Sequence, residues 1–306
     1  MSHNHSHGHG HDHGGSNYNR AFIISVALNT GFVIIEAVYG ILANSLALLA
    51  DAGHNLSDVL GLLLAWGASI LARRRPTARR TYGLRRSSIL AALLNAAFLL
   101  VVSGGIGWEA IQRFREPASV AGGTVITVAA VGIAINTVSA LMFLSGRKSD
   151  LNIRGAFLHL VADAAVSVGV VLAGIAIIAT GWLWFDPAVS LIVTVVIVAG
   201  TWQLFQESLN LITDAVPAGI EPLAVRTYLA ELPGVTGVHD LHIWAMSTTE
   251  TALTVHLVMP TGHSGDAFLA RVVRELHDNF GIEHTTLQVE TGDPSYPCPL
   301  AQGNLV

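Results

Sequence analysis

Six long runs of apolar residues alternate with short polar segments over the first two thirds of the chain. A helix needs about 17–25 residues to cross a bilayer, and each run is that long. The expected spans lie near residues 21–42, 46–71, 88–111, 121–144, 155–178 and 184–209. Composition supports them, because 52% of the 306 residues are hydrophobic and 12% are charged, whereas a soluble domain carries roughly 25% charged residues. The sequence therefore predicts a multi-pass membrane protein, and its first span is expected to be retained because no cleavable signal precedes it.

The pattern changes near Asp214, where shorter and more polar elements begin. An amphipathic helix is expected at 220–231, followed by apolar alternation at 235–246 and 251–259, a helix at 265–280 and a strand at 284–291. This αββαβ order predicts a small two-layer α+β domain with its helices on one face of a mixed sheet. The chain is thus divided into a histidine-rich disordered tail at 1–17, a six-span transmembrane domain at 18–212, an α+β domain at 213–292 and a C-terminal tail at 293–306.

Basic residues are confined to alternate loops between the spans. The 73–86 loop holds seven arginines and the 145–154 loop adds three basic residues, whereas the intervening loops contribute only Arg113 and Arg115. Because basic loops stay on the cytoplasmic side, both termini are expected in the cytoplasm. The arginine-rich loop lies between two spans, so contact with lipid headgroups is favoured over RNA binding. From Thr213 onward three arginines face eleven acidic residues, which also argues against nucleic acid.

Two His–Asp pairs interrupt the apolar runs. His54 and Asp58 lie four residues apart in the second span, and His159 and Asp163 repeat that spacing in the fifth. Side chains four residues apart project from one face of a helix. An ionisable group at bilayer depth costs about 2.5–3.5 kcal/mol, so four such groups need a partner. Two imidazoles and two carboxylates match the number and type of ligands in a tetrahedral Zn²⁺ site.

The two pairs are expected to meet. The second span leaves toward the cytoplasm and the fifth enters from it, so the helices are antiparallel. At 1.5 Å per residue, Asp58 and Asp163 both fall near the middle of their spans. Two further acidic residues leave more than one interpretation open. Glu36 in the first span either lines a cation path or forms structural hydrogen bonds, the second being favoured, and Asp51 either belongs to an access path or accepts hydrogen bonds from a neighbouring helix.

Histidines also gather outside the spans. Six of them fall within residues 1–15, in a tract that cannot pack a core but binds Zn²⁺, Ni²⁺ or Cu²⁺, unless it is an affinity tag or a dispensable tail. His239 and His256 fall on neighbouring predicted strands and Glu290 on the third, so these three side chains are candidates for a second metal site. His242, His263 and His277 are interpreted as ordinary surface histidines.

With these residues in view, the chain resembles the cation diffusion facilitators, a family of zinc exporters with six spans and a ferredoxin-like cytoplasmic domain. The resemblance extends from about Ala21 to Glu290. It rests on LADAGHNLSD at 49–58, TYGLR at 81–85, DLNIRGAFLH at 150–159, VHDLHIW at 238–244 and HTTLQVE at 284–290.

The resemblance implies that His54, Asp58, His159 and Asp163 are the transport-site ligands, with Zn²⁺ preferred and Cd²⁺ tolerated. It also implies that His239, His256 and Glu290 bind zinc and favour a homodimer formed through the cytoplasmic domain and the transmembrane helices. Some features depart from the family pattern. The 73–88 loop has no His or Asp, so the extra loop site of some members is expected to be absent. Cys298 is the only cysteine of the chain, which excludes an internal disulfide. Some relatives have paired cysteines in this tail region.

The favoured hypothesis is a non-enzymatic antiporter in a bacterial inner membrane that exports Zn²⁺ while protons enter. Protons compete with the metal for the same imidazole and carboxylate lone pairs. An intramembrane zinc hydrolase would need an open metal position for water and a general base, and the sequence contains no HExxH motif. A metal-sensing receptor would bind metal at the cytoplasmic domain without any flux. A flux assay separates these alternatives.

Overall fold

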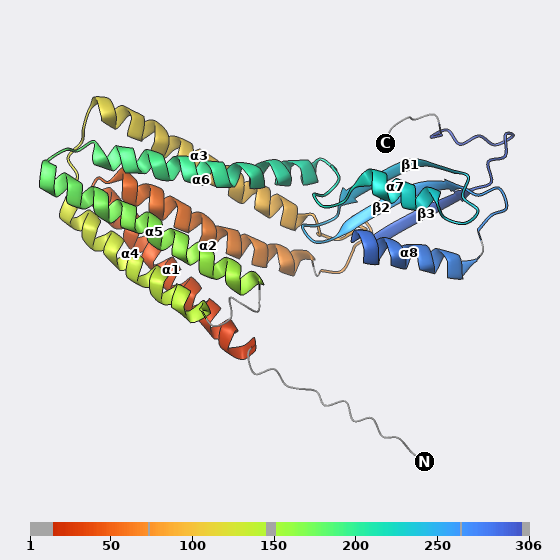
Figure 1. Ribbon diagram of the computed structural model, residues 1–306, viewed down its shortest axis with the longest axis horizontal. Coiled ribbons are helices and arrows are strands. Elements are labelled where there is room, and N and C mark those ends of the chain that lie inside the picture. Colours follow the sequence, from red (N-terminus) through yellow and green to blue (C-terminus); the bar gives the residue numbers. More distant parts are fainter. Residues whose placement is uncertain (1–14, 73, 145–150, 264, 302–306) are drawn as a thin grey trace, which may run out of the picture. The chain divides into compact units, whose positions relative to one another are not determined.

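The computed structural model describes residues 15–72, 74–144, 151–263 and 265–301. Its described part begins with six long helices, as predicted (Figure 1). They are α1 (Gly15–Leu42), α2 (Leu46–Ala72), α3 (Ser87–Arg115), α4 (Gly122–Phe143), α5 (Leu151–Thr180) and α6 (Phe185–Ile212). The predicted metal-binding tract at 1–14 and most of the basic 145–154 loop lie outside the described residues.

The apolar faces of these helices point outward. Among the described residues, α3, α4, α5, α6 and the part of α1 from Ile24 are long and apolar enough to cross a membrane. Helix α2 is equally long but carries Asp51, His54 and Asp58. Side chains such as Val101 and Ile192 are exposed although they are strongly apolar. Apolar residues on the outside and backbone hydrogen bonds satisfied within each helix are what a hydrocarbon solvent requires.

Two compact units make up the chain. One comprises Met1–Leu60 and Phe98–Gly200, and the other comprises Gly61–Ala97 and Thr201–Val306. In the first unit α1, α4 and α5 pack side by side (Figure 1). Glycines allow this close approach: a Cβ on Gly174 of α5 would lie 2.7 Å from Ile126 of α4 and 3.2 Å from the carbonyl oxygen of Gly122. Small residues at helix interfaces are typical of membrane proteins.

The start of α2 is held by a carboxylate from α6. Asp186 accepts hydrogen bonds from the backbone N–H of Leu46 at 2.8 Å and of Ala47 at 3.3 Å, and from the Ser45 hydroxyl. These N–H groups have no partner inside the helix, and a negative charge at a helix N-terminus is favourable. The contact therefore fixes where α2 begins, and with it the position of every polar residue on that helix.

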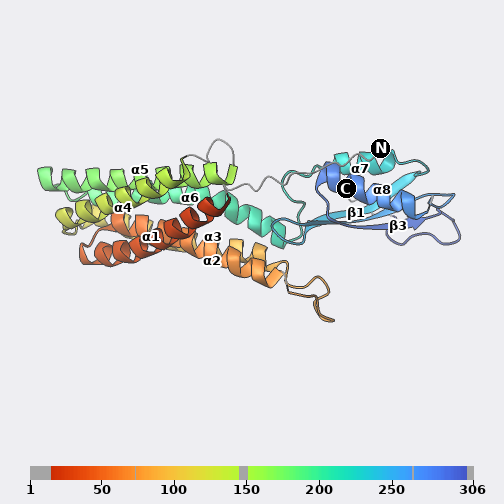
Figure 2. The same ribbon diagram turned by 90° about the horizontal axis from the view of Figure 1, so that it is seen from below.

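The C-terminal part is the predicted α+β domain. It contains α7 (Pro222–Ala230), β1 (Gly237–Ala245), β2 (Thr251–Val258), α8 (Asp266–Phe280) and β3 (His284–Glu290). The sheet order is β1-β2-β3, with β1 antiparallel and β3 parallel to the central strand. Both helices cover the same face of the sheet (Figure 2). The predicted fold class, a helical transmembrane domain plus a small mixed α+β domain, is confirmed.

This domain has its own core between the helices and the sheet. Val225 and Leu229 of α7 and Val272 and Leu276 of α8 pack on Leu253 and other buried residues of the strands. Helix α8 ends at Gly281, whose φ of 66° is the left-handed conformation that glycine adopts without strain. The core occupies one face of the sheet, which leaves polar side chains of the strands on the other face free to form a site.

Candidate metal centres

The polar residues of α2 form a single stripe. Asp51, His54, Asn55 and Asp58 follow one another at spacings of three, one and three residues, which places all four on one face of a helix. Asp51 and Asn55 are buried and His54 and Asp58 are partly buried. Helix α2 is otherwise apolar and thus presents one polar face to its neighbours.

Helix α5 brings the second His–Asp pair to this stripe. His159 Nε2 lies 3.2 Å from Asp58 Oδ2 and 3.5 Å from Asp163 Oδ2. His54 Nε2 lies 3.6 Å from Asp163 Oδ1 and 3.8 Å from Asp58 Oδ2. Each imidazole therefore contacts both carboxylates, including the one on the other helix. The structure brings together the four residues that the sequence pairs up only two by two.

The four donors are not equally gathered. One ligand atom from each of Asp58, His159 and Asp163 lies within 4.8 Å of the others, whereas His54 stands outside this tight group. The His54 Nδ1 is buried and has no hydrogen-bond partner within the described part of the chain. Asp163 is almost fully buried, whereas 45% of the His159 side chain is exposed. The cluster is therefore closed on the Asp163 side and accessible at His159.

A second polar cluster adjoins the first. Asn55 Nδ2 lies 3.3 Å from Glu36 Oε2 of α1 and 3.4 Å from Asp51 Oδ1. The Ser167 hydroxyl of α5 donates to Asp51 Oδ2 at 3.0 Å. Sequence patterns left the roles of Glu36 and Asp51 open and did not pair them, because no local spacing links residues on different helices.

The α+β domain contains the other predicted cluster. His239 and His256 are directly opposite each other on β1 and β2, with ring centroids 5.2 Å apart. The carboxylate of Glu290 on β3 contacts both rings, with its Oε2 3.4 Å from His239 Nε2 and its Oε1 3.0 Å from His256 Nδ1. The three strands thus bring the predicted residues together on one patch of the sheet.

Two residues join this cluster that sequence reasoning did not assign to it. Cys298 Sγ lies 3.6 Å from His256 Nδ1, and the ligand atoms of His239, His256, Glu290 and Cys298 all lie within 4.8 Å of one another. Asp240 Oδ2 lies 3.5 Å from His256 Nε2. Asp240 has a φ of 51° at an irregularity in the β1–β2 pairing, and such a bulge redirects a side chain. The HDLH segment at 239–242 is the sequence signal for Asp240, but local periodicity does not predict a bulge there.

The charge of Glu290 suits a cation. Burial raises the pKa of this carboxyl, but hydrogen bonds from Cys298 and Gln288 lower it, as do the two neighbouring imidazoles. The net pKa is below that of an ordinary glutamate. Glu290 therefore stays ionised at neutral pH, the form that binds a metal.

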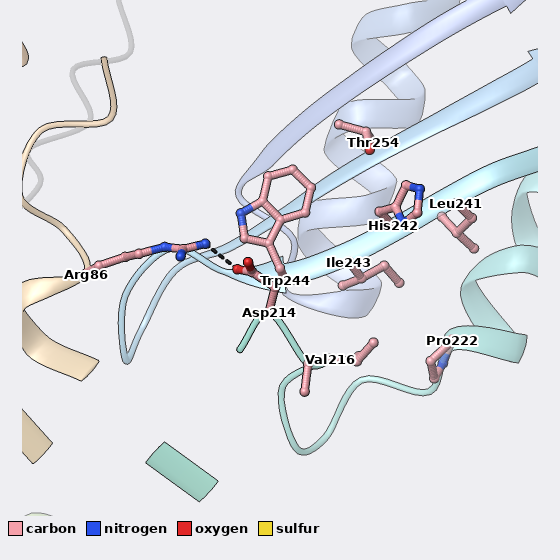
Figure 3. A pocket seen from close by; sticks show the side chains of 10 residues that line it. Arg86, Asp214, Val216, Pro222, Leu241, His242, Ile243, Trp244 and Thr254 are labelled. Atoms are coloured by element: carbon pink, nitrogen blue, oxygen red, sulfur yellow. Dashed lines mark hydrogen bonds and ion pairs between the residues drawn. The ribbon is translucent and has the colours of Figure 1, made fainter. Parts of the chain in front are cut away.

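Among the described residues, the other histidines of the domain lie outside the group formed by His239, His256, Glu290 and Cys298, although His242 Nε2 lies 3.0 Å from Asp240 Oδ1. His242 and His277 have well-exposed side chains, as predicted for surface histidines, and the His284 ring packs edge-on against Tyr82. His242 borders a pocket of about 660 Å³ together with Leu241, Ile243 and Trp244, at whose edge Arg86 pairs with Asp214 (Figure 3). None of the clustered metal-site residues lines this pocket.

Comparison with known proteins identifies the family. Residues 22–213 match the cation efflux transmembrane domain, and residues 217–292 match the cytoplasmic domain of cation efflux proteins. The chain belongs to the cation diffusion facilitator family. It is a multi-pass membrane transporter of the cation efflux type and not an enzyme, as the sequence analysis expected.

Curated relatives match this transporter over nearly its whole length. It is 39% identical to the cadmium, cobalt and zinc/H⁺-K⁺ antiporter of Bacillus velezensis, with 91% of this chain and 90% of the relative covered. It is 37% identical to the zinc transporter ZitB of Escherichia coli, over 90% and 88% of the two chains. It is 38% identical to the metal cation efflux system protein CzcD of Cupriavidus metallidurans, over 92% and 88%.

Proposed function

We propose that this transporter exports Zn²⁺, and also Cd²⁺, from the cytoplasm in exchange for H⁺. The proposed site for the metal is formed by His54, Asp58, His159 and Asp163. The observation that carries this proposal is the mutual contact of the two pairs, with all four His–Asp distances between 3.2 and 3.8 Å. Relatives whose names specify zinc, cadmium and proton exchange support the choice of ions.

The donor set favours borderline cations. Imidazole nitrogen suits Zn²⁺, and two carboxylates neutralise its charge, whereas Mg²⁺ and Ca²⁺ prefer shells made of oxygen alone. A proton taken up by the same lone pairs would displace the metal, which couples the two ions in opposite directions.

Release of the metal requires the two pairs to separate. Four ligands without an open position would form a structural site that retains its ion. The ligands come from two helices, so a shift of α5 against α2 would open the shell toward one side of the membrane. The exposed His159 and buried Asp163 fit a site that is open on one side at a time.

The second cluster fits a regulatory site. We assign His239, His256 and Glu290 as Zn²⁺ ligands in the cytoplasmic domain at 213–292, with Cys298 of the C-terminal tail as a fourth. Thiolate and imidazole together form a favourable set for Zn²⁺. We expect the metal to favour a homodimer that involves this domain and the transmembrane helices of 18–212. The expected location is a bacterial inner membrane with both termini in the cytoplasm, where the tail at 1–17 would capture metal.

A flux measurement tests the transport site. Full-length protein in proteoliposomes with an imposed pH gradient should accumulate Zn²⁺, and Asp163→Ala should reduce the flux to the level of empty liposomes. The matched control is Glu109→Ala, which removes an exposed carboxylate of α3 that pairs with Arg113 and is not a member of the quartet. Near wild-type flux in Asp163→Ala would refute the site. Metal binding by the wild type without any flux would instead identify a sensor.

A further inference from the structure

Two acidic side chains of the membrane domain are completely buried next to each other. Glu36 of α1 and Asp51 of α2 each have 0% of their surface exposed. A single nitrogen, Nδ2 of Asn55, reaches both carboxyl groups, and the two groups also lie within hydrogen-bonding reach of each other. The pair is thus one compact unit.

The surroundings of the pair contain no charge that would balance two anions. Among the described residues, neither carboxylate forms an ion pair with Lys, Arg or His, and the nearest other titratable groups are His54 of α2 and Asp163 of α5. The other donor is the Ser167 hydroxyl, and no donor among the described residues forms a hydrogen bond with Glu36 Oε1. Two adjacent buried carboxylates without a cation cannot both be ionised, so one proton must lie between them.

The quartet is formed by α2 and α5, and on each of these helices a residue of the pair or its hydrogen-bond partner lies one helical turn from the quartet. Asp51 precedes His54 by three residues, and Ser167, its partner on α5, follows Asp163 by four. Helices α2 and α5 run in opposite directions, so both offsets lead to the same side. With both termini in the cytoplasm, that side is the exterior. Asn55, which bridges the carboxylates, adjoins the ligand His54.

We propose that Glu36 and Asp51 form a proton relay between the exterior and the metal quartet. This inference rests on the proposed function. As Zn²⁺ leaves, the O–H bond between the pair and its proton breaks and the proton bonds to a vacated lone pair of the quartet. In the same step a hydronium ion at the exterior gives a proton to the pair, so that the two carboxylates are never both ionised. Each such step moves one proton inward and consumes no other reactant.

Replacing Glu36 by Gln tests the relay, because the amide keeps the size of the side chain but cannot carry the proton. Two activities of the full-length protein in proteoliposomes are compared. One is Zn²⁺ transport driven by a pH gradient, and the other is exchange of isotopically labelled Zn²⁺ for unlabelled Zn²⁺ at equal pH, which requires no net proton transfer. In Glu36→Gln, proton-driven transport should fall by about 100-fold, the lower range for a positioned proton-transfer group, while zinc self-exchange stays within about twofold of wild type.

Asp51→Asn should give the same separation, and the double variant should be no worse than either single one, because one shared proton is lost in each case. Glu109→Gln, the same change at an exposed carboxylate, should affect neither activity. Loss of both activities in both single variants would assign the pair to folding alone and overturn the proposal. Retention of proton-driven transport would also overturn it. If wild type transports no Zn²⁺ at all, the proposed function fails instead.

Infrared spectroscopy of the wild type provides a measurement that does not depend on the variants. A protonated carboxyl group has a carbonyl stretch that a carboxylate lacks, and it shifts in D₂O. The metal-free protein at neutral pH should show this band, and Zn²⁺ release should change it. Absence of a protonated carboxyl band would overturn the proposal even if Glu36→Gln and Asp51→Asn both failed to fold.

Discussion

Asp51 and Asp163 are both buried carboxylates of the membrane domain, but their neighbours differ. Asp163 contacts the imidazoles of His54 and His159, whose nitrogens are metal donors. Asp51 instead accepts hydrogen bonds from an amide and a hydroxyl. A carboxylate among imidazoles suits a metal ion, whereas one beside a second carboxylate suits a proton. The two roles proposed for the same residue type thus differ because the neighbours differ.

The selectivity of the quartet should depend on His54. In His54→Asp, a harder oxygen donor replaces a borderline nitrogen donor, and Mn²⁺ tolerates oxygen-rich shells better than Cd²⁺ does. We expect the ratio of Mn²⁺ to Cd²⁺ flux to rise by about an order of magnitude, which corresponds to about 1.4 kcal/mol of discrimination. Flux of Zn²⁺, Cd²⁺ and Mn²⁺ by wild type and variant provides the measurement. An unchanged ranking of the three metal fluxes would mean that His54 is not a metal ligand. That result would agree with its position outside the tight group of Asp58, His159 and Asp163.

At the scale of elements, two contacts set how the polar residues meet. Asp186 of α6 fixes the first turn of α2, and the facing glycines Gly122 and Gly174 allow α4 and α5 to approach closely. Because α5 also carries His159 and Asp163, the packing of α5 on α4 affects the geometry of the quartet. Neither contact involves a residue of the proposed metal site, so their loss should act through structure alone.

A bulkier side chain at Gly174 should disturb this packing. In Gly174→Val the new atoms would collide with Ile126 and with the backbone of Gly122, and such overpacking costs about 1–3 kcal/mol. Gly169→Val on the same helix is the control, since no atom lies within 4 Å of a Cβ at that position. Thermal unfolding of the detergent-solubilised protein should show a lower midpoint for Gly174→Val than for Gly169→Val. Equal midpoints would mean that α4 and α5 do not depend on this contact.

At the scale of the whole molecule, charge is distributed unevenly along the chain. Seven arginines fall in the 73–86 loop, whereas the charged residues after Thr213 are mostly acidic. A membrane potential and anionic lipids both favour keeping such a basic loop in the cytoplasm. The same topology would place the C-terminal domain in the cytoplasm, and the single cysteine provides a test of this orientation.

Cys298 should react only from the cytoplasmic side. A membrane-impermeant maleimide, with chelator present to free the thiol, should label inside-out vesicles and leave intact cells unlabelled. The control is the double variant Cys298→Ser, Ser119→Cys, in which the cysteine lies in a predicted exterior loop. It should be labelled in intact cells and not in inside-out vesicles. Labelling of Cys298 in intact cells would reverse the orientation and, with it, the direction assigned to the proton relay.

Much of the fold follows from sequence because the solvent is hydrocarbon. No water is available there to satisfy the backbone, so a long apolar run has to be a helix. The spacing of His54 and Asp58 then places both side chains on one face without any tertiary information. The strands and helices after Asp214 were predictable for a similar reason, since their apolar periodicity records which face is buried.

Tertiary structure decided which of these faces meet. The pairing of Glu36 with Asp51, the approach of Cys298 to His256 and the bulge that turns Asp240 toward that histidine all join residues that no local spacing relates. Periodicity specifies the direction of a side chain on its own element, because backbone geometry repeats. It does not specify the partner, because packing between elements depends on the shapes of all the surfaces in contact.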